Sequence, residues 1–163
     1  AISPASTPMQ SFANTDTINI YSAKFYLLNP TGAAGTLTAN LYAHTGTYGT
    51  NSAPTGASLA TSTSIDATTI STTVYTLYEF LFEGASRYEM QAGTNYMIAV
   101  HNTVNGTVRV AIDATSPSHA GNAWVVIPYT IYDINFFVYG QVVSAGTAAL
   151  TPILGLVKSF WIF

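Results

Sequence analysis

The chain has 163 residues, of which 48% are hydrophobic and only 7% are charged, and its formal net charge is −3 at pH 7. Nucleic acids and anionic membrane surfaces are bound by clustered Lys and Arg, so a chain with 4 basic residues excludes both as partners. The length fits one domain able to bury its own core, and the absence of cysteine excludes disulfide bonds.

Period-2 alternation of apolar and polar side chains dominates from residue 10 to residue 143 and predicts an all-β domain. In 36–43, for example, Leu37, Ala39 and Leu41 share one face, as in a strand buried on one side. Strands are predicted at 10–13, 17–28, 36–43, 58–62, 74–83, 96–102, 107–113, 124–129 and 132–143.

Segments rich in Gly, Pro, Asn and Ser separate these strands and predict turns or loops. They lie at 29–32, 44–57, 83–86, 105–106 and 116–122. So many short strands in one domain imply two packed antiparallel sheets, closed as a jelly roll or a related Greek-key sandwich. We therefore divide the chain into an N-terminal extension (1–9), a β-sandwich domain (10–143) and a C-terminal apolar segment (144–163).

Several stretches of the predicted sandwich carry short motifs that occur together in one family. They include Gln10-Ser11-Phe12, Gly35-Thr36-Leu37-Thr38-Ala39-Asn40-Leu41-Tyr42 and Gly93-Thr94-Asn95-Tyr96. In these positions the chain resembles the jelly-roll domains of secreted microbial surface proteins, of the choice-of-anchor type. That resemblance implies an extracellular β-sandwich displayed on a surface, with no catalytic signature and no defined ligand.

Residues 150–163 form an almost wholly apolar tail, which we call the apolar tail. It is shorter than the roughly 20 apolar residues of a membrane-spanning helix and contains Lys158, so no membrane span is expected. Thr151 as N-cap with Pro152 in the first turn favours a short amphipathic helix. The continuous apolar run 160–163 favours a buried strand instead, and we expect the strand.

An exposed apolar tail needs a partner, and copies of the same chain are the partner that we expect. The predicted function is an extracellular, non-enzymatic structural subunit that self-assembles into a filament or surface polymer by inserting this tail into a neighbour. The predicted assembly residues are Ile153, Leu154, Leu156, Val157, Phe160, Trp161, Ile162 and Phe163.

A cell-surface or extracellular location is expected from the abundant Ser and Thr and the low charge. The chain also begins Ala1-Ile2, as in a mature protein whose signal peptide has been removed or in a chain trimmed at that point. Asn105-Gly106-Thr107 is a candidate glycosylation sequon at Asn105, usable in a cell that glycosylates secreted proteins.

The alternative function is a carbohydrate-binding or adhesion module of a cell surface or virion, in which the tail covers the domain's own sheet. Sugars bind exposed aromatic faces flanked by amide and hydroxyl groups. The candidate glycan-binding residues are Tyr48, Asn122, Trp124 and Tyr129. Trp124 can equally be an anchor of the core.

Catalytic and metal motifs are absent from the sequence. His44, His101 and His119 share no local motif, and no GxSxG accompanies the Ser/His/Asp residue types near Ser116 and Asp113. Glu79 and Glu83 share a predicted strand face about 13 Å apart, farther than paired glycosidase carboxylates. No enzyme activity and no cofactor are expected, the single candidate being a structural Ca²⁺ bound through oxygens of Asn14, Asp16, Asn19, Asp133 and Asn135.

Overall fold

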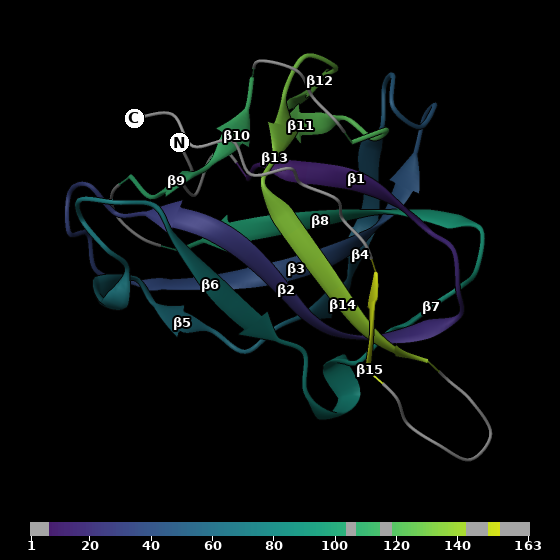
Figure 1. The fold of residues 1–163 in the computed structure, drawn as a ribbon, viewed down its shortest axis with the longest axis horizontal. Helices are drawn as coiled ribbons and strands as arrows, with labels where there is room; N and C mark the ends of the chain where they lie inside the picture. Colours follow the sequence, from purple (N-terminus) through teal and green to yellow (C-terminus); the bar gives the residue numbers. More distant parts are fainter. Residues whose placement is uncertain (1–6, 104–106, 115–118, 143–149, 154–163) are drawn as a thin grey trace.

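The computed structural model describes residues 7–103, 107–114 and 119–142, together with the backbone of residues 150–153. Two antiparallel sheets pack face to face in it (Figure 1), so the predicted all-β sandwich is confirmed. Strands that are distant in the chain lie side by side, as Greek-key and jelly-roll connections require: β1 pairs with β8, and β2 with β14. Among the described residues, no helix is long and apolar enough to cross a membrane.

The first sheet has seven strands in the order β12-β11-β1-β8-β3-β4, with β5 also paired to β3. Its longest strands are β3, β4 and β8. β3 alternates between buried and more exposed side chains, β4 is exposed over much of its length, and β8 is buried almost throughout. The strands are β1 (Met9–Asn14), β3 (Thr36–Thr45), β4 (Ala53–Thr61), β5 (Ile65–Asp66), β8 (Thr94–Asn102), β11 (Ala123–Val125) and β12 (Ile127–Tyr129).

The second sheet has six strands in the order β15-β14-β2-β6, with β7 and β9 also paired to β2. β10 (Ile112–Asp113) and β13 (Asp133–Ile134) form a separate two-stranded ladder. Two short 3-10 turns, η1 (Ala67–Thr69) and η2 (Gly84–Ser86), flank β6 in the chain. The sheet strands are β2 (Ile18–Leu28), β6 (Thr76–Leu81), β7 (Glu89–Met90), β9 (Arg109–Val110), β14 (Phe136–Val142) and β15 (Leu150–Ile153).

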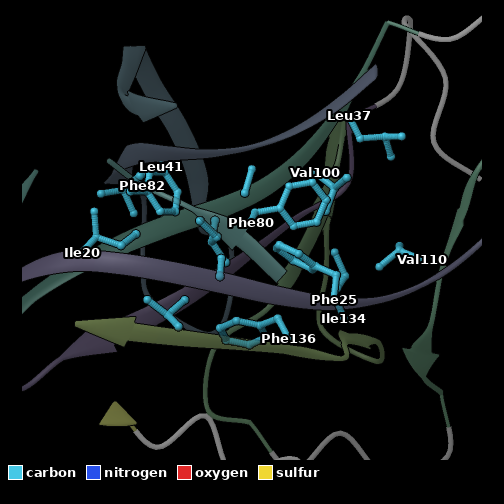
Figure 2. Packing of buried hydrophobic residues seen from close by; sticks show 14 of the residues in the cluster. Ile20, Phe25, Leu37, Leu41, Phe80, Phe82, Val100, Val110, Ile134 and Phe136 are labelled. Carbon is cyan, nitrogen blue, oxygen red and sulfur yellow. The ribbon is translucent and has the colours of Figure 1, made fainter. Parts of the chain in front are cut away.

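The main core lies between the two sheets, where the inward side chains of both meet (Figure 2). Phe25 and Phe80, on neighbouring strands of the six-stranded sheet, pack edge to face with ring centroids 5.9 Å apart. Phe12 of the other sheet approaches Phe136 to 6.1 Å and joins the two layers. A smaller cluster of Met9, Met97 and Ala99 packs with Tyr42 and Trp124.

Three predicted elements differ from the structure. The predicted strand 124–129 is instead a hairpin of β11 and β12, which turns at Val126 with a φ of 69°. The predicted strand 107–113 is divided between β9 and β10, and the predicted loop 44–57 is shorter because β3 continues to Thr45 and β4 begins at Ala53. Pro54 is tolerated in β4 because β4 is an edge strand, where a missing N–H breaks no ladder.

Candidate functional site

A buried polar cluster lies where β1, β13 and the segment before β11 meet. The Gln10 amide donates from Nε2 to Oδ1 of Asp133 at 2.8 Å, and its Oε1 accepts the N–H of Ile134 at 2.9 Å. The backbone N–H of His119 donates to Oδ2 of Asp133 at 3.0 Å. Both carboxylate oxygens of Asp133 therefore accept hydrogen bonds from the chain itself.

The protonation states of this cluster follow from its burial. Burial raises the pKa of Asp133, although the His119 N–H and the Gln10 amide act in the opposite direction. Burial also lowers the pKa of His119, against the opposing effect of the Asp133 charge. The His119 Nδ1 accepts the N–H of Gly121 at 3.1 Å, so the neutral ring is the form that fits this turn.

The cluster continues through Asn122 to the loop between β3 and β4. The Asn122 side chain accepts the Ser52 N–H at 3.0 Å and donates to the Ser52 carbonyl at 3.3 Å, and its backbone N–H donates to Ser11 Oγ at 2.8 Å. His44 Nε2 lies 2.9 Å from Ser52 Oγ, and its ring contacts Tyr48 edge to face. These bonds fix the loop against β1 and β11.

These contacts resemble a catalytic set only in residue type. A serine nucleophile needs an accessible Oγ, whereas Ser52 is fully buried. Asp133 contacts the backbone N–H of His119 and not its ring, so it does not orient the imidazole as the acid of a triad does. Ser116 lies outside the described residues. The geometry fits a structural role for this cluster.

The candidate glycan-binding residues lie in one region but do not share one exposed face. Asn122 is fully buried and its amide is used inside the chain. Trp124 pairs with Pro128 across the hairpin, whereas Tyr129 pairs with Ala123 and therefore faces the opposite side. Tyr129 packs against Tyr132 and the main core. Tyr48 is half-buried, and burial raises the pKa of its hydroxyl.

Among the oxygen groups considered for calcium, Asn14 Oδ1 and Asn135 Oδ1 are buried without a hydrogen-bond partner in the described part of the chain. Asn14 donates from Nδ2 to the carbonyls of Asp16 at 2.6 Å and Gln91 at 2.9 Å, which closes the turn after β1. Asp133 is committed to Gln10 and His119. Within the part of the chain that the structure describes, no three or more His, Cys, Asp or Glu side chains form a group that could hold a metal.

The start of the apolar tail is an edge strand. The backbone of β15 pairs antiparallel with β14, so that Ile153 lies opposite Val138 and Leu150 opposite Gln141. A strand, and not a helix capped by Thr151, is therefore present over 150–153, whereas the run 160–163 lies outside the described residues. The predicted assembly residues Leu154, Leu156, Val157, Phe160, Trp161, Ile162 and Phe163, and the glycosylation candidate Asn105, lie outside the described residues.

The opposite edge of the same sheet is β6, which the sequence did not single out as a functional edge (Figure 1). Tyr75 is 45% exposed and Leu77 is 38% exposed, and Val74 is also exposed beside them. Val74 and Tyr75 directly precede β6, and the exposure of these side chains, which the structure shows and the sequence alternation does not, marks this edge. A second exposed apolar group, Val126 with Ile127 and Ile131, lies at and near the β11–β12 hairpin.

Comparisons of the chain with protein-family models, with curated proteins and with solved structures find no match.

Proposed function

We propose that this protein is an extracellular structural subunit that assembles with copies of itself through its apolar tail into a filament or surface polymer. The observation that supports this most directly is the position of β15. The tail begins as the last described strand of a sheet, paired to β14. A segment that begins at a sheet edge is suited to strand addition.

The composition of the tail supplies the driving force for assembly. Its aromatic and branched aliphatic side chains, Phe160, Trp161, Ile162 and Phe163 among them, each contribute about 1.5–3 kcal/mol when buried, before entropic costs. Because only 7% of the chain's residues are charged, many copies can approach one another without strong repulsion. Insertion of the tail of each copy into the next is a heterologous contact, which generates open polymers or rings.

The test compares the full chain with a variant that ends at Ile153. This variant keeps β15 and every described core residue. We expect light scattering to give a molar mass that rises with concentration for the full chain and stays at one protomer for the variant. Circular dichroism must show the same β content in both. Equal molar masses of the two proteins at every concentration would refute assembly through the tail.

A spectroscopic measurement follows the tail itself. The chain has 2 Trp, Trp124 and Trp161, so the Trp124→Phe variant leaves Trp161 as the sole indole. We expect its emission to shift to shorter wavelength as concentration rises, because assembly buries the ring. The matched control, Trp161→Phe, should show an emission from Trp124 that is independent of concentration.

Adhesion to glycans is the second candidate function. Trp124 and Tyr42 are both half-buried and pack on the same small cluster, and partly exposed aromatic rings are a feature of sugar-binding faces. A glycan array distinguishes the two candidates: selective binding that Trp124→Ala abolishes supports adhesion, whereas no binding by the folded protein removes it.

A further inference from the structure

The main-chain groups of β6 point alternately toward β2 and toward the opposite edge, which Thr63 covers at Leu81. The Phe82 N–H donates to the Tyr21 carbonyl at 2.8 Å, toward β2, whereas the Leu81 carbonyl accepts the Thr63 N–H at 2.8 Å on the other side. Orientation alternates along an antiparallel strand, so the main-chain groups of Leu77 and Glu79 point away from β2, like those of Leu81. In the described part of the chain, no strand is paired to β6 on that side.

The side chains along this edge complement the apolar tail. Glu79 is 41% exposed and lies 3.4 Å from Lys24, its partner in an ion pair. Lys158 is the only charged residue of the tail. An antiparallel strand that places Lys158 opposite Glu79 also places Phe160 opposite Leu77, because side chains on one face recur every second residue.

The same register can be extended past Thr76, the first residue of β6, to the two residues that precede the strand. Ile162 then lies opposite Tyr75 on the outer face, and Phe163 lies opposite Val74. Leu77 of β6 and the two residues that directly precede this strand, Val74 and Tyr75, are exposed in the structure. The pairing covers all three and adds a second cation beside Glu79.

We propose that the apolar tail of one copy adds as an antiparallel strand to the β6 edge of a second copy, with Lys158 opposite Glu79. This inference rests on the proposed function and names its acceptor site. One sheet then offers a donor at its β15 edge and an acceptor at its β6 edge, and repetition continues the sheet from copy to copy.

The reach of the tail favours a second copy over the same chain. Ile153, Val138, Ala23 and Phe80 form one row across the sheet, next to Glu79. A strand beyond β6 lies four strand spacings from β15, about 19 Å at the usual spacing between strands. The five residues from Ile153 to Lys158 span at most about 18 Å when fully extended, without any detour around side chains.

Directed disulfides test the register, because the chain has no cysteine. Leu77→Cys and Phe160→Cys proteins are mixed and oxidised, and covalent dimers are counted on a non-reducing gel. We expect efficient dimer formation for this pair. The control pair, Leu77→Cys with Ser159→Cys, should give about tenfold less, because Cβ vectors that point apart cannot be bridged.

A proline tests strand addition without a new charge. In Leu77→Pro the lost N–H faces the open edge and not β2, so we expect the domain to fold and assembly to be lost. Leu77→Ala keeps the N–H and should assemble more strongly than the proline variant. Where Leu77→Pro does not fold by circular dichroism, the disulfide result alone decides.

The outcomes separate the two proposals. If the full chain stays a single protomer at all concentrations, the proposed function fails. If assembly depends on the tail but the Leu77–Phe160 pair crosslinks no better than its control, or a folded Leu77→Pro protein assembles like Leu77→Ala, the β6 edge is refuted as acceptor and tail-mediated assembly stands.

Discussion

Gln10 and Asp133, 123 residues apart in the chain, are joined by a buried 2.8 Å hydrogen bond that links β1 to β13. The same Gln10 side chain also accepts the N–H of Ile134. One carboxamide thus satisfies two groups of the segment that leads into β14. β15, with which the apolar tail begins, is paired to that same β14, so this hydrogen-bonded contact supports the donor edge of the proposed assembly.

Replacement of Gln10 by Ala should destabilise the domain by about 2–4 kcal/mol, because a buried acceptor of Asp133 and the buried N–H of Ile134 both lose their partner. Urea unfolding followed by circular dichroism measures the loss. Gln91→Ala is the matched control, since the side chain of Gln91 is exposed and donates an exposed hydrogen bond to Glu89, and the effect of its loss should stay within about 0.5 kcal/mol. Equal effects of the two variants would contradict the role given to Gln10.

Stability should fall as the pH falls below the ordinary His pKa of 6.5, in part through His119. Burial lowers the pKa of His119, so the unfolded chain binds the proton first and the free energy of unfolding rises with pH in that window. Full stabilisation is present above 6.5 and is lost toward the lower pKa of the folded state. Urea unfolding between about pH 7.5 and pH 5.5 measures this slope.

His119→Asn isolates that contribution, because the Asn oxygen can accept the Gly121 N–H in place of Nδ1 without titrating. The difference in unfolding free energy between wild type and variant should decrease as pH falls. His44, whose pKa burial also lowers, accounts for the slope that remains in the variant. Asp133 acts oppositely, since burial raises its pKa: its contribution is full below 3.8 and is lost as pH rises through the higher pKa of the folded state. If the difference in unfolding free energy between wild type and His119→Asn grows on acidification, the slope is not assigned correctly to His119.

Most of the sandwich could be predicted from the alternation of apolar side chains, because burial on one face imposes a period of two on each strand. The turn at Val126 could not, since hairpin turns with positive φ normally carry Gly or Asn and the sequence offers Val at that position. The Gln10–Asp133 contact has no sequence signal either. It depends on which strands meet, and that is set by the whole topology and not by local pattern.

The open edge of β6 was equally hidden in the sequence. The alternation around Phe80 and Phe82 predicts a strand, but it does not distinguish an edge strand from a central one. That distinction depends on whether another strand pairs with β6 on the side away from β2. Leu77 becomes informative only when its exposure is known.

Gly49→Ala should be far more costly than Gly32→Ala. Both glycines have positive φ, 75° and 62°, which costs Ala about 1 kcal/mol at either site. A Cβ at Gly32 meets nothing within 4 Å, whereas at Gly49 it collides with the carbonyl oxygen of Ala120. We expect an additional loss of about 2 kcal/mol at Gly49, because the loop must separate from the segment before β11. Thermal unfolding of the pair gives the difference, and similar melting temperatures would contradict this packing.

Val126→Asn should stabilise the protein by about 0.5–1 kcal/mol, because a β-branched residue with a φ of 69° is strained and Asn adopts this conformation readily. The Val126 side chain is 67% exposed, so little buried apolar surface is lost. Urea unfolding measures the gain. Val125→Asn is the control. Val125, which precedes Val126 in the chain, has no positive φ and is less exposed, so the same substitution there should destabilise the protein. A loss of stability in both variants would mean that contacts of the Val126 side chain outweigh its backbone strain.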